Sequence, residues 1–62
     1  MTKAELNELR PGDKVVYEAA NRTTKGKITA VFRDSHYAVK WSDGTTDTCP
    51  ITEEGDRHLK RG

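Results

Sequence analysis

The stretch from Gly26 to Cys49 constrains the fold of this chain more than any other part. It holds three short runs of strand-forming residues, two turn signals, and the only Trp and Phe of the sequence. The second turn signal is Asp43-Gly44, a pair that favours a tight hairpin because the turn requires positive φ angles. The stretch therefore predicts a three-stranded antiparallel meander.

The turn positions also predict the register of both hairpins. A turn centred on Asp34-Ser35 aligns the first two strands in three pairs: Phe32 with Tyr37, Ala30 with Val39 and Ile28 with Trp41. A two-residue turn at Asp43-Gly44 aligns the next two strands in three pairs: Trp41 with Thr46, Val39 with Thr48 and Lys40 with Asp47. Because strand side chains alternate between two faces, the six residues of the first hairpin are predicted to form the inward face. Trp41 is thereby assigned to the core.

Residues 1–9 are predicted to form a short helix. Thr2 followed three residues later by Glu5 is a capping-box pattern, which marks a helix start. Leu6 and Leu9 fall on one face of this helix, at a spacing of three residues. The helix can therefore dock on the sheet or on another subunit, and both alternatives stay open.

The remaining elements are short. Residues 14–18 predict a first strand, residues 19–25 a polar loop, and Gly26 a bulge or sharp bend. Residues 56–60 are compatible with a fifth strand that has Leu59 on one face. We expect one domain over residues 1–62, comprising the helix and a small barrel over residues 13–60.

Composition limits what the domain can be. A chain of 62 residues buries a small core, so a partner or a second copy of the chain would stabilise it. The net charge is +1, a single Cys excludes an intrachain disulfide, and no apolar run is long enough to span a membrane. We expect a cytoplasmic protein that does not associate with membranes.

Three motifs give the chain a family resemblance. They are Leu9-Arg10-Pro11-Gly12-Asp13-Lys14-Val15, Gly26-Lys27-Ile28 and Tyr37-Ala38-Val39-Lys40-Trp41-Ser42-Asp43-Gly44. Together they resemble the small SH3-like barrels of Tudor and KOW type, over about residues 9–51. The resemblance implies an all-β fold, a strongly bent five-stranded antiparallel barrel, with the short N-terminal helix added to it. The motifs are turn and core residues, which specify fold better than function.

A more distant similarity is to the plasmid-borne type II dihydrofolate reductases, which use a related small barrel as a tetramer. It rests on the Gly-Asp-Lys-Val entry at Gly12–Val15 and on the second-strand opening at Gly26. The active pore of that family depends on a late Val-Gln-Ile-Tyr stretch. Here the corresponding residues 47–51 read Asp-Thr-Cys-Pro-Ile, without the Gln and Tyr. A reductase is therefore only a remote alternative.

No catalytic constellation is visible in the sequence. The two histidines and the lone Cys49 show no zinc-ligand spacing, and the acidic cluster at residues 53–56 is typical of a polar turn. We expect no catalytic residues, no cofactor and no metal, and therefore no enzyme. Most of the four aromatic residues are needed for the core, which argues against an aromatic cage for a methylated amine.

Local charge is the strongest functional signal. Residues 22–40 carry five basic residues against Asp34 alone, whereas residues 41–62 carry a balance of −2. The basic residues are Arg22, Lys25, Lys27, Arg33 and Lys40. The predicted register places the last four on the outer face of one hairpin, where a basic stripe can follow phosphates without reading base sequence.

Two functions follow from these observations. The first is a protein-interaction or accessory module, with Leu6, Leu9 and the sheet edges as candidate contacts to another protein or a second copy of the chain. The alternative is a module that binds RNA or DNA through the five basic residues.

Overall fold

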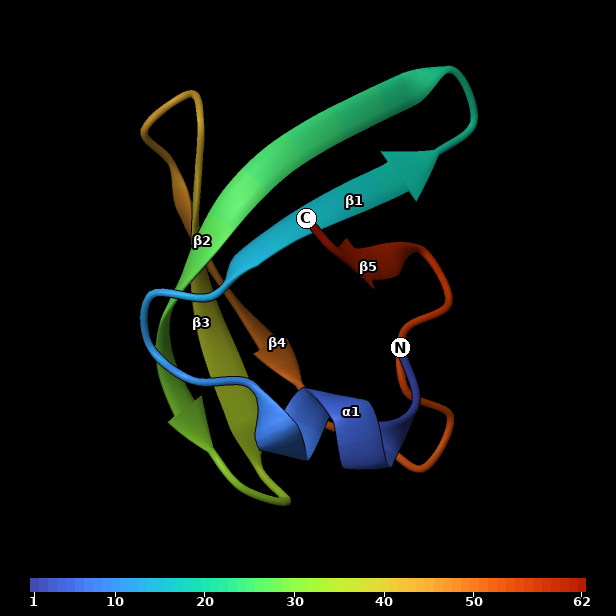
Figure 1. Cartoon of the computed structure of the whole chain (residues 1–62). Helices are drawn as coiled ribbons and strands as arrows, with labels where there is room; N and C mark the ends of the chain where they lie inside the picture. The colour runs from blue at the N-terminus through green and yellow to red at the C-terminus, as the bar shows by residue number, and fades with distance from the viewer.

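The computed structural model describes all residues from 1 to 62 and contains one short helix and five strands (Figure 1). In chain order they are α1 (Lys3–Glu8), β1 (Lys14–Ala19), β2 (Arg22–Phe32), β3 (His36–Trp41), β4 (Thr46–Pro50) and β5 (Leu59–Arg61). All pairings are antiparallel, in the strand order β4-β3-β2-β1-β5. The mostly-β prediction is confirmed. The outermost strands β4 and β5 do not pair with each other, so the sheet is open and its closure into a barrel is not shown.

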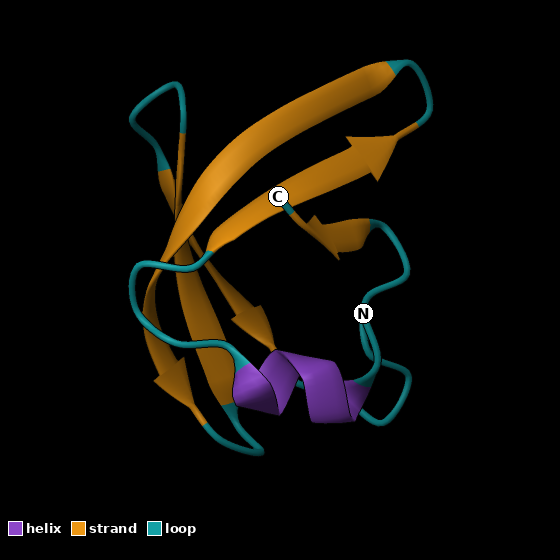
Figure 2. Ribbon diagram, in the orientation of Figure 1, coloured by secondary structure: helices purple, strands orange, loops and turns teal.

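The helix begins where the sequence predicts. The Glu5 amide donates to Thr2 Oγ1 at 3.2 Å and the Thr2 amide donates to Glu5 Oε1 at 2.9 Å, which completes the capping box. Figure 2 shows the helix lying across the open side of the bent sheet. Leu6 and Leu9 are 0% and 3% exposed, because both pack against the sheet of their own chain. Of the two alternatives for the helix, docking on the sheet is the one observed.

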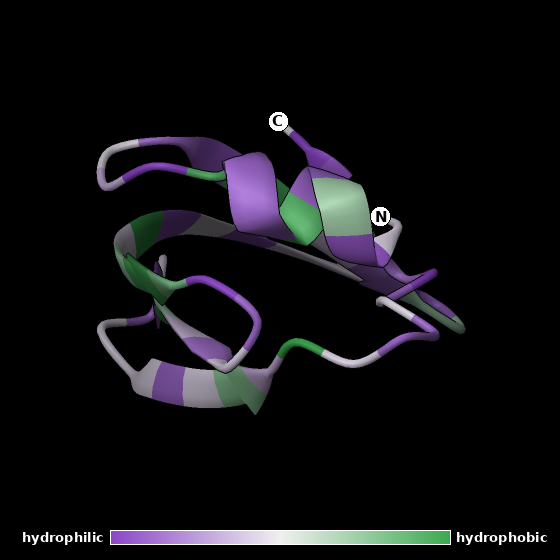
Figure 3. Cartoon of the chain, turned by 90° about the horizontal axis from the view of Figure 1, so that it is seen from below, coloured by the Kyte–Doolittle hydropathy of each residue, from purple (hydrophilic) through white to green (hydrophobic).

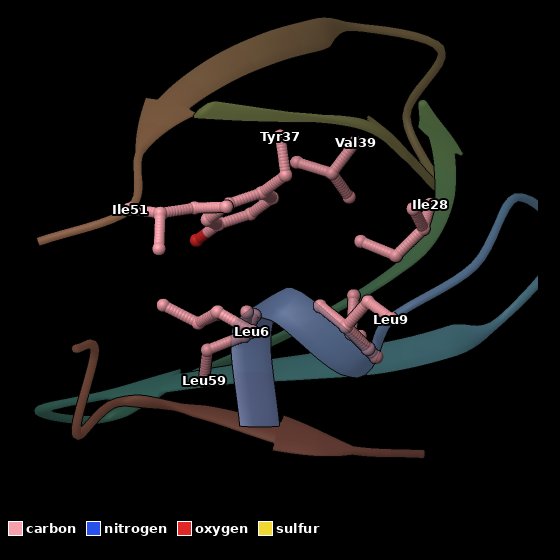
Figure 4. Packing of buried hydrophobic residues seen from close by; sticks show 8 residues of the cluster. Leu6, Leu9, Ile28, Tyr37, Val39, Ile51 and Leu59 are labelled. Carbon is pink, nitrogen blue, oxygen red and sulfur yellow. The ribbon is translucent and has the colours of Figure 1, made fainter. Parts of the chain in front are cut away.

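The core is one cluster of buried side chains from α1, from the strands β1, β2, β3 and β5, and from the residues that directly follow α1 and β4 (Figure 4). Its members are Leu6, Leu9, Val15, Ile28, Tyr37, Val39, Ile51 and Leu59. Apolar stretches are few and short along the ribbon, and hydrophilic stretches dominate (Figure 3). No helix is long and apolar enough to cross a membrane.

The predicted polar loop over residues 19–25 is wrong. β2 begins at Arg22, which pairs with Ala19, so only Ala20 and Asn21 form the turn. Ala20 has a φ of +51°, a conformation that is unfavourable for alanine. The turn contains no Gly or Pro, and the sequence therefore does not indicate that β2 starts at Arg22.

The predicted register between β2 and β3 is also wrong. The turn holds three residues, with Asp34 at a φ of +61°, and Phe32 pairs with His36 rather than with Tyr37. A β-bulge between Ile28 and Ala30 then shifts the pairing by one more residue. As a result Phe32 is 53% exposed instead of inward.

The register between β3 and β4 differs for the same reason. The turn spans three residues, Ser42 to Gly44, and Gly44 takes the left-handed conformation with a φ of +93°. Three-residue hairpins of this kind are common. Lys40 therefore pairs with Thr46, and the predicted pair of Lys40 with Asp47 is not formed.

The bulge predicted at Gly26 lies further along β2, between Ile28 and Ala30. At Gly26 a glycine is needed because the Trp41 and Val39 side chains leave no space for a Cβ. A Cβ on Gly26 would lie 2.6 Å from Trp41 Cε3 and 2.8 Å from Val39 Cγ2. The indole packs directly over the glycine backbone. This close contact sets the position of Trp41 at the edge of the core.

The final strand is shorter than predicted. It covers Leu59–Arg61, and Leu59 is buried while Lys60 and Arg61 are exposed. Pairing of Tyr17 with Leu59 joins β5 to β1.

Candidate functional site

Three lysines lie side by side across three neighbouring strands. Lys14 on β1 pairs with Lys27 on β2, and Lys27 pairs with Lys40 on β3. Neighbouring strands are about 4.8 Å apart, so this lysine row spans about 10 Å. All three side chains are exposed on the outer face of the sheet, opposite the core. Like charges directly opposite one another on a sheet are destabilising.

No carboxylate neutralises the lysine row. The ion pairs of the molecule involve Lys3, Lys60 and Arg61, and none includes a lysine of the row or Lys25. Lys25 lies two residues before Lys27, on the same face of β2. A shallow hollow of about 390 Å³ lies over these four lysines, lined also by Gly26, Thr29, Trp41 and Ser42. The four lysines therefore form a cationic patch on the outer face, and none of them is in an ion pair.

The structure brings together three of the five basic residues expected from the sequence. Lys25, Lys27 and Lys40 lie around the hollow. Arg22 is the first residue of β2, beside the β1–β2 turn, and it does not line the hollow. Arg33 lies in the β2–β3 turn at the other end of the sheet, in a separate cleft beside α1.

Lys14 was not among the residues expected at this site. Its outward orientation follows from alternation along β1. Its position beside Lys27 depends on the register between β1 and β2. That register is not predictable from the sequence, because the turn between the two strands contains no Gly or Pro.

The inner side of the sheet carries a surface of opposite character, an acidic cleft of about 450 Å³ at the edge of the core. Aromatic side chains and carboxylates line it together, chiefly Tyr17, Tyr37, Trp41, Asp43, Asp47 and Asp56. The rings of Tyr17 and Trp41 meet edge to face with centroids 6.1 Å apart. Trp41 Nε1 donates a hydrogen bond to Asp47 Oδ2 at 2.7 Å, which fixes the indole in the cleft wall.

The assignment of Trp41 to the core was therefore only half right. Trp41 packs against the core but is only partly buried, and it lines the acidic cleft together with Tyr17. The core is made by one buried aromatic, Tyr37, with aliphatic residues. Consequently the side chains of Tyr17 and Trp41 remain available to a ligand in the cleft.

Hydrogen bonds and burial set the protonation states in the cleft. The Thr45 hydroxyl and amide donate to Asp43 Oδ1 at 2.6 and 2.9 Å, and they lower the pKa of Asp43. Burial raises the pKa of the Cys49 thiol and that of the Tyr37 phenol, and nearby carboxylates act in the same direction. The cleft at neutral pH thus combines an ionised Asp43 with a neutral Cys49, which is a poor nucleophile.

Leu6 and Leu9, the residues expected to contact a partner, lie in the core and expose almost no surface. No group of three or more His, Cys, Asp and Glu side chains is arranged to hold a metal ion. Comparison of the chain with protein-family models, curated proteins and solved structures finds no match. The lysine row and the acidic cleft are the two surfaces on which function can be argued.

Proposed function

We propose that this protein binds nucleic acid by contacting phosphates with the lysine row and Lys25. The observation that carries the proposal is the row itself: Lys14, Lys27 and Lys40 adjacent on three strands, with no carboxylate in contact. One strand of DNA presents a phosphate about every 3.4 Å along the helix axis. A row of about 10 Å can therefore meet about three consecutive phosphates.

The arrangement costs stability, which supports a binding role. Cross-strand charge pairs contribute about 0.2–1 kcal/mol, with the sign set by whether the charges are opposite or alike. Lys27 has a like charge on both sides. A polyanion would remove this repulsion by placing its phosphates over the ammonium groups.

We expect Lys27→Glu to raise stability and weaken binding at the same time. The substitution converts two repulsive pairs into two attractive ones, so the free energy of unfolding should rise by on the order of 1 kcal/mol. The melting temperature should therefore rise by several degrees. Affinity for a fluorescein-labelled oligonucleotide should fall at least 10-fold in anisotropy titrations, because a phosphate contact is replaced by repulsion. For the unmodified chain, four phosphate contacts predict a slope of about −3 to −4 in log K against log salt.

The matched control is Arg57→Glu, which makes the same charge change at an exposed turn residue just before β5. It should leave affinity within about 2-fold. Equal weakening by both variants would show a response to net charge alone and would contradict a site at the lysine row. No binding at 20 mM salt would also contradict it.

We also infer that the chain is an SH3-like small barrel of Tudor or KOW type, in an open form. The support is the antiparallel order β4-β3-β2-β1-β5, the strong bend of β2 (Figure 1) and the motifs at Gly12-Asp13 and Asp43-Gly44. Such barrels serve unrelated functions, so this inference does not choose between ligands.

A second candidate function is protein interaction through the acidic cleft. Aromatic faces attract cations, and ionised carboxylates beside them add charge complementarity. The arrangement of Tyr17, Trp41, Asp43 and Asp47 favours an Arg or Lys side chain of a partner protein.

The only Trp of the sequence lies in this cleft and therefore reports directly on its occupancy. Titration with Arg- or Lys-containing peptides should change Trp41 fluorescence, and Asp47→Asn should weaken that response at least 5-fold by removing a charge. The control Glu54→Gln removes a charge from an exposed turn outside the cleft and should have no effect. An unchanged Trp41 spectrum at millimolar peptide would exclude this function.

A further inference from the structure

We infer that the outer face of β2 and β3 is a platform for single-stranded nucleic acid, on which a base stacks against Phe32 while phosphates follow the lysines. This inference rests on the proposed function and specifies its substrate class. Phe32 is the one large apolar side chain that is exposed, at 53%. The hydrophobic effect gives no reason for it to face water in a chain with so small a core.

β3 connects the two parts of the platform. His36, Ala38 and Lys40 alternate along an uninterrupted strand and share its outer face, because Tyr37 and Val39 are buried on the other. Phe32 pairs with His36 at one end of this face and Lys27 pairs with Lys40 at the other. Lys40 lies four positions after His36, so the two ends are about 13 Å apart along the strand.

The aromatic end already contains a stack of two rings. The Phe32 and His36 ring centroids are 4.5 Å apart, with an angle of 32° between the ring planes. The Ser35 hydroxyl lies 2.8 Å from His36 Nδ1 and holds the imidazole in place. A base can extend this stack on the free face of Phe32.

The surface between the two ends carries small, uncharged side chains. Ala30 pairs with Ala38 in the middle of the hairpin, and Thr48 pairs with Ala38 from the other side. None of the outward residues of β2, β3 or β4 is acidic. They are Thr23, Lys25, Lys27, Thr29, Ala30, Phe32, His36, Ala38, Lys40, Thr46, Thr48 and Pro50. A chain of nucleotides can therefore cross this face without meeting a carboxylate.

Single strands are favoured over duplexes because stacking requires an unpaired base. The bases of a duplex are stacked on one another, whereas those of a single strand are free to lie on an aromatic side chain. A distance of about 13 Å between the ends leaves room for a few nucleotides of an extended single strand. We expect weak preference among base sequences, because every base has an aromatic face.

The test compares a labelled 12-nucleotide oligo-dT with a 12-base-pair duplex, using anisotropy titrations of the full chain. We expect the single strand to bind at least 5-fold more tightly. Phe32→Ala should weaken single-strand binding about 10-fold and leave duplex binding and the salt slope unchanged, because it removes a stack and no charge. Phe32→Trp should retain single-strand affinity. Since Phe32 is exposed, thermal melting should show that both variants fold.

The outcomes separate this inference from the proposed function. Equal affinity for single strand and duplex, both lost in Lys27→Glu, would overturn the platform and leave phosphate binding intact. No binding to either probe would overturn both. Vesicles of phosphatidylserine and phosphatidylcholine serve as a competing surface: binding to them that exceeds oligo-dT binding and depends on Phe32 would also overturn the platform, because it would show the face to be a lipid contact.

Discussion

Leu6→Ala is expected to lower the free energy of unfolding by about 3 kcal/mol. The Leu6 side chain is fully buried against the sheet, and truncating a buried leucine removes apolar contacts and leaves a cavity. For a domain of this size each 1 kcal/mol corresponds to about 4–8 °C, so the melting temperature should fall by about 12–24 °C. Circular dichroism melting and urea titration both measure the effect.

The matched control is Glu8→Ala, on the exposed side of the same short helix. It changes no core contact, and its cost should stay within about 0.5 kcal/mol. If Leu6→Ala and Glu8→Ala were equally mild, α1 would not be docked on the sheet. Leu6 and Leu9 would then be free to contact a partner, as in the protein-interaction function expected from the sequence.

Local signals in the sequence predict the elements of this fold well. The helix start at Thr2 and the position of β1 need only a capping box and a Pro-Gly turn, whose effects reach a few residues. A turn that contains Asp43-Gly44 joins β3 and β4 at the expected place, although it has three residues rather than two. In each case the decisive interaction lies within the segment that encodes it.

Registers are less predictable, because a change of one residue in a turn moves every pair in the hairpin. Two- and three-residue turns are both compatible with the residues around Asp34, and the structure has the longer turn. The bulge after Ile28 depends on packing across the sheet and leaves no signal in β2 itself. The longer turn moves Phe32 from the predicted inward face to the surface, whereas the bulge returns Ile28 to the inward face.

The same limit applies to the candidate site. The excess of basic residues over 22–40 is visible in the sequence, and it correctly groups Lys25, Lys27 and Lys40. Lys14 joins them only through the β1–β2 pairing, and Phe32 is exposed only through the β2–β3 register. A cluster of charges that are close in the sequence can therefore be predicted. The residues that other strands add to the cluster can be identified only when the pairing of those strands is known.

Gly55→Ala is expected to destabilise the protein by about 3 kcal/mol, for two reasons that add. Gly55 has a φ of +68°, and alanine in the left-handed region costs about 1–2 kcal/mol. In addition, a Cβ at this position would collide with the Met1 carbonyl oxygen and lie 2.9 Å from Thr2 Cα. Overpacking of this kind costs about 1–3 kcal/mol when the neighbour is backbone that cannot turn away.

Gly44→Ala separates the two contributions. Gly44 also has a positive φ, at +93°, but an added Cβ would meet no atom within 4 Å. Its cost in urea titrations should therefore be the backbone term alone, about 1–2 kcal/mol.

The excess cost at Gly55 measures how firmly residues 1–2 are held against the turn. The Asp56 amide donates to the Met1 carbonyl at 2.8 Å and the Met1 amino group donates to the Leu59 carbonyl at 2.9 Å, so we expect that excess to be at least 1 kcal/mol. Equal costs at the two glycines would show that this contact between the first residues and the turn before β5 does not contribute to folding.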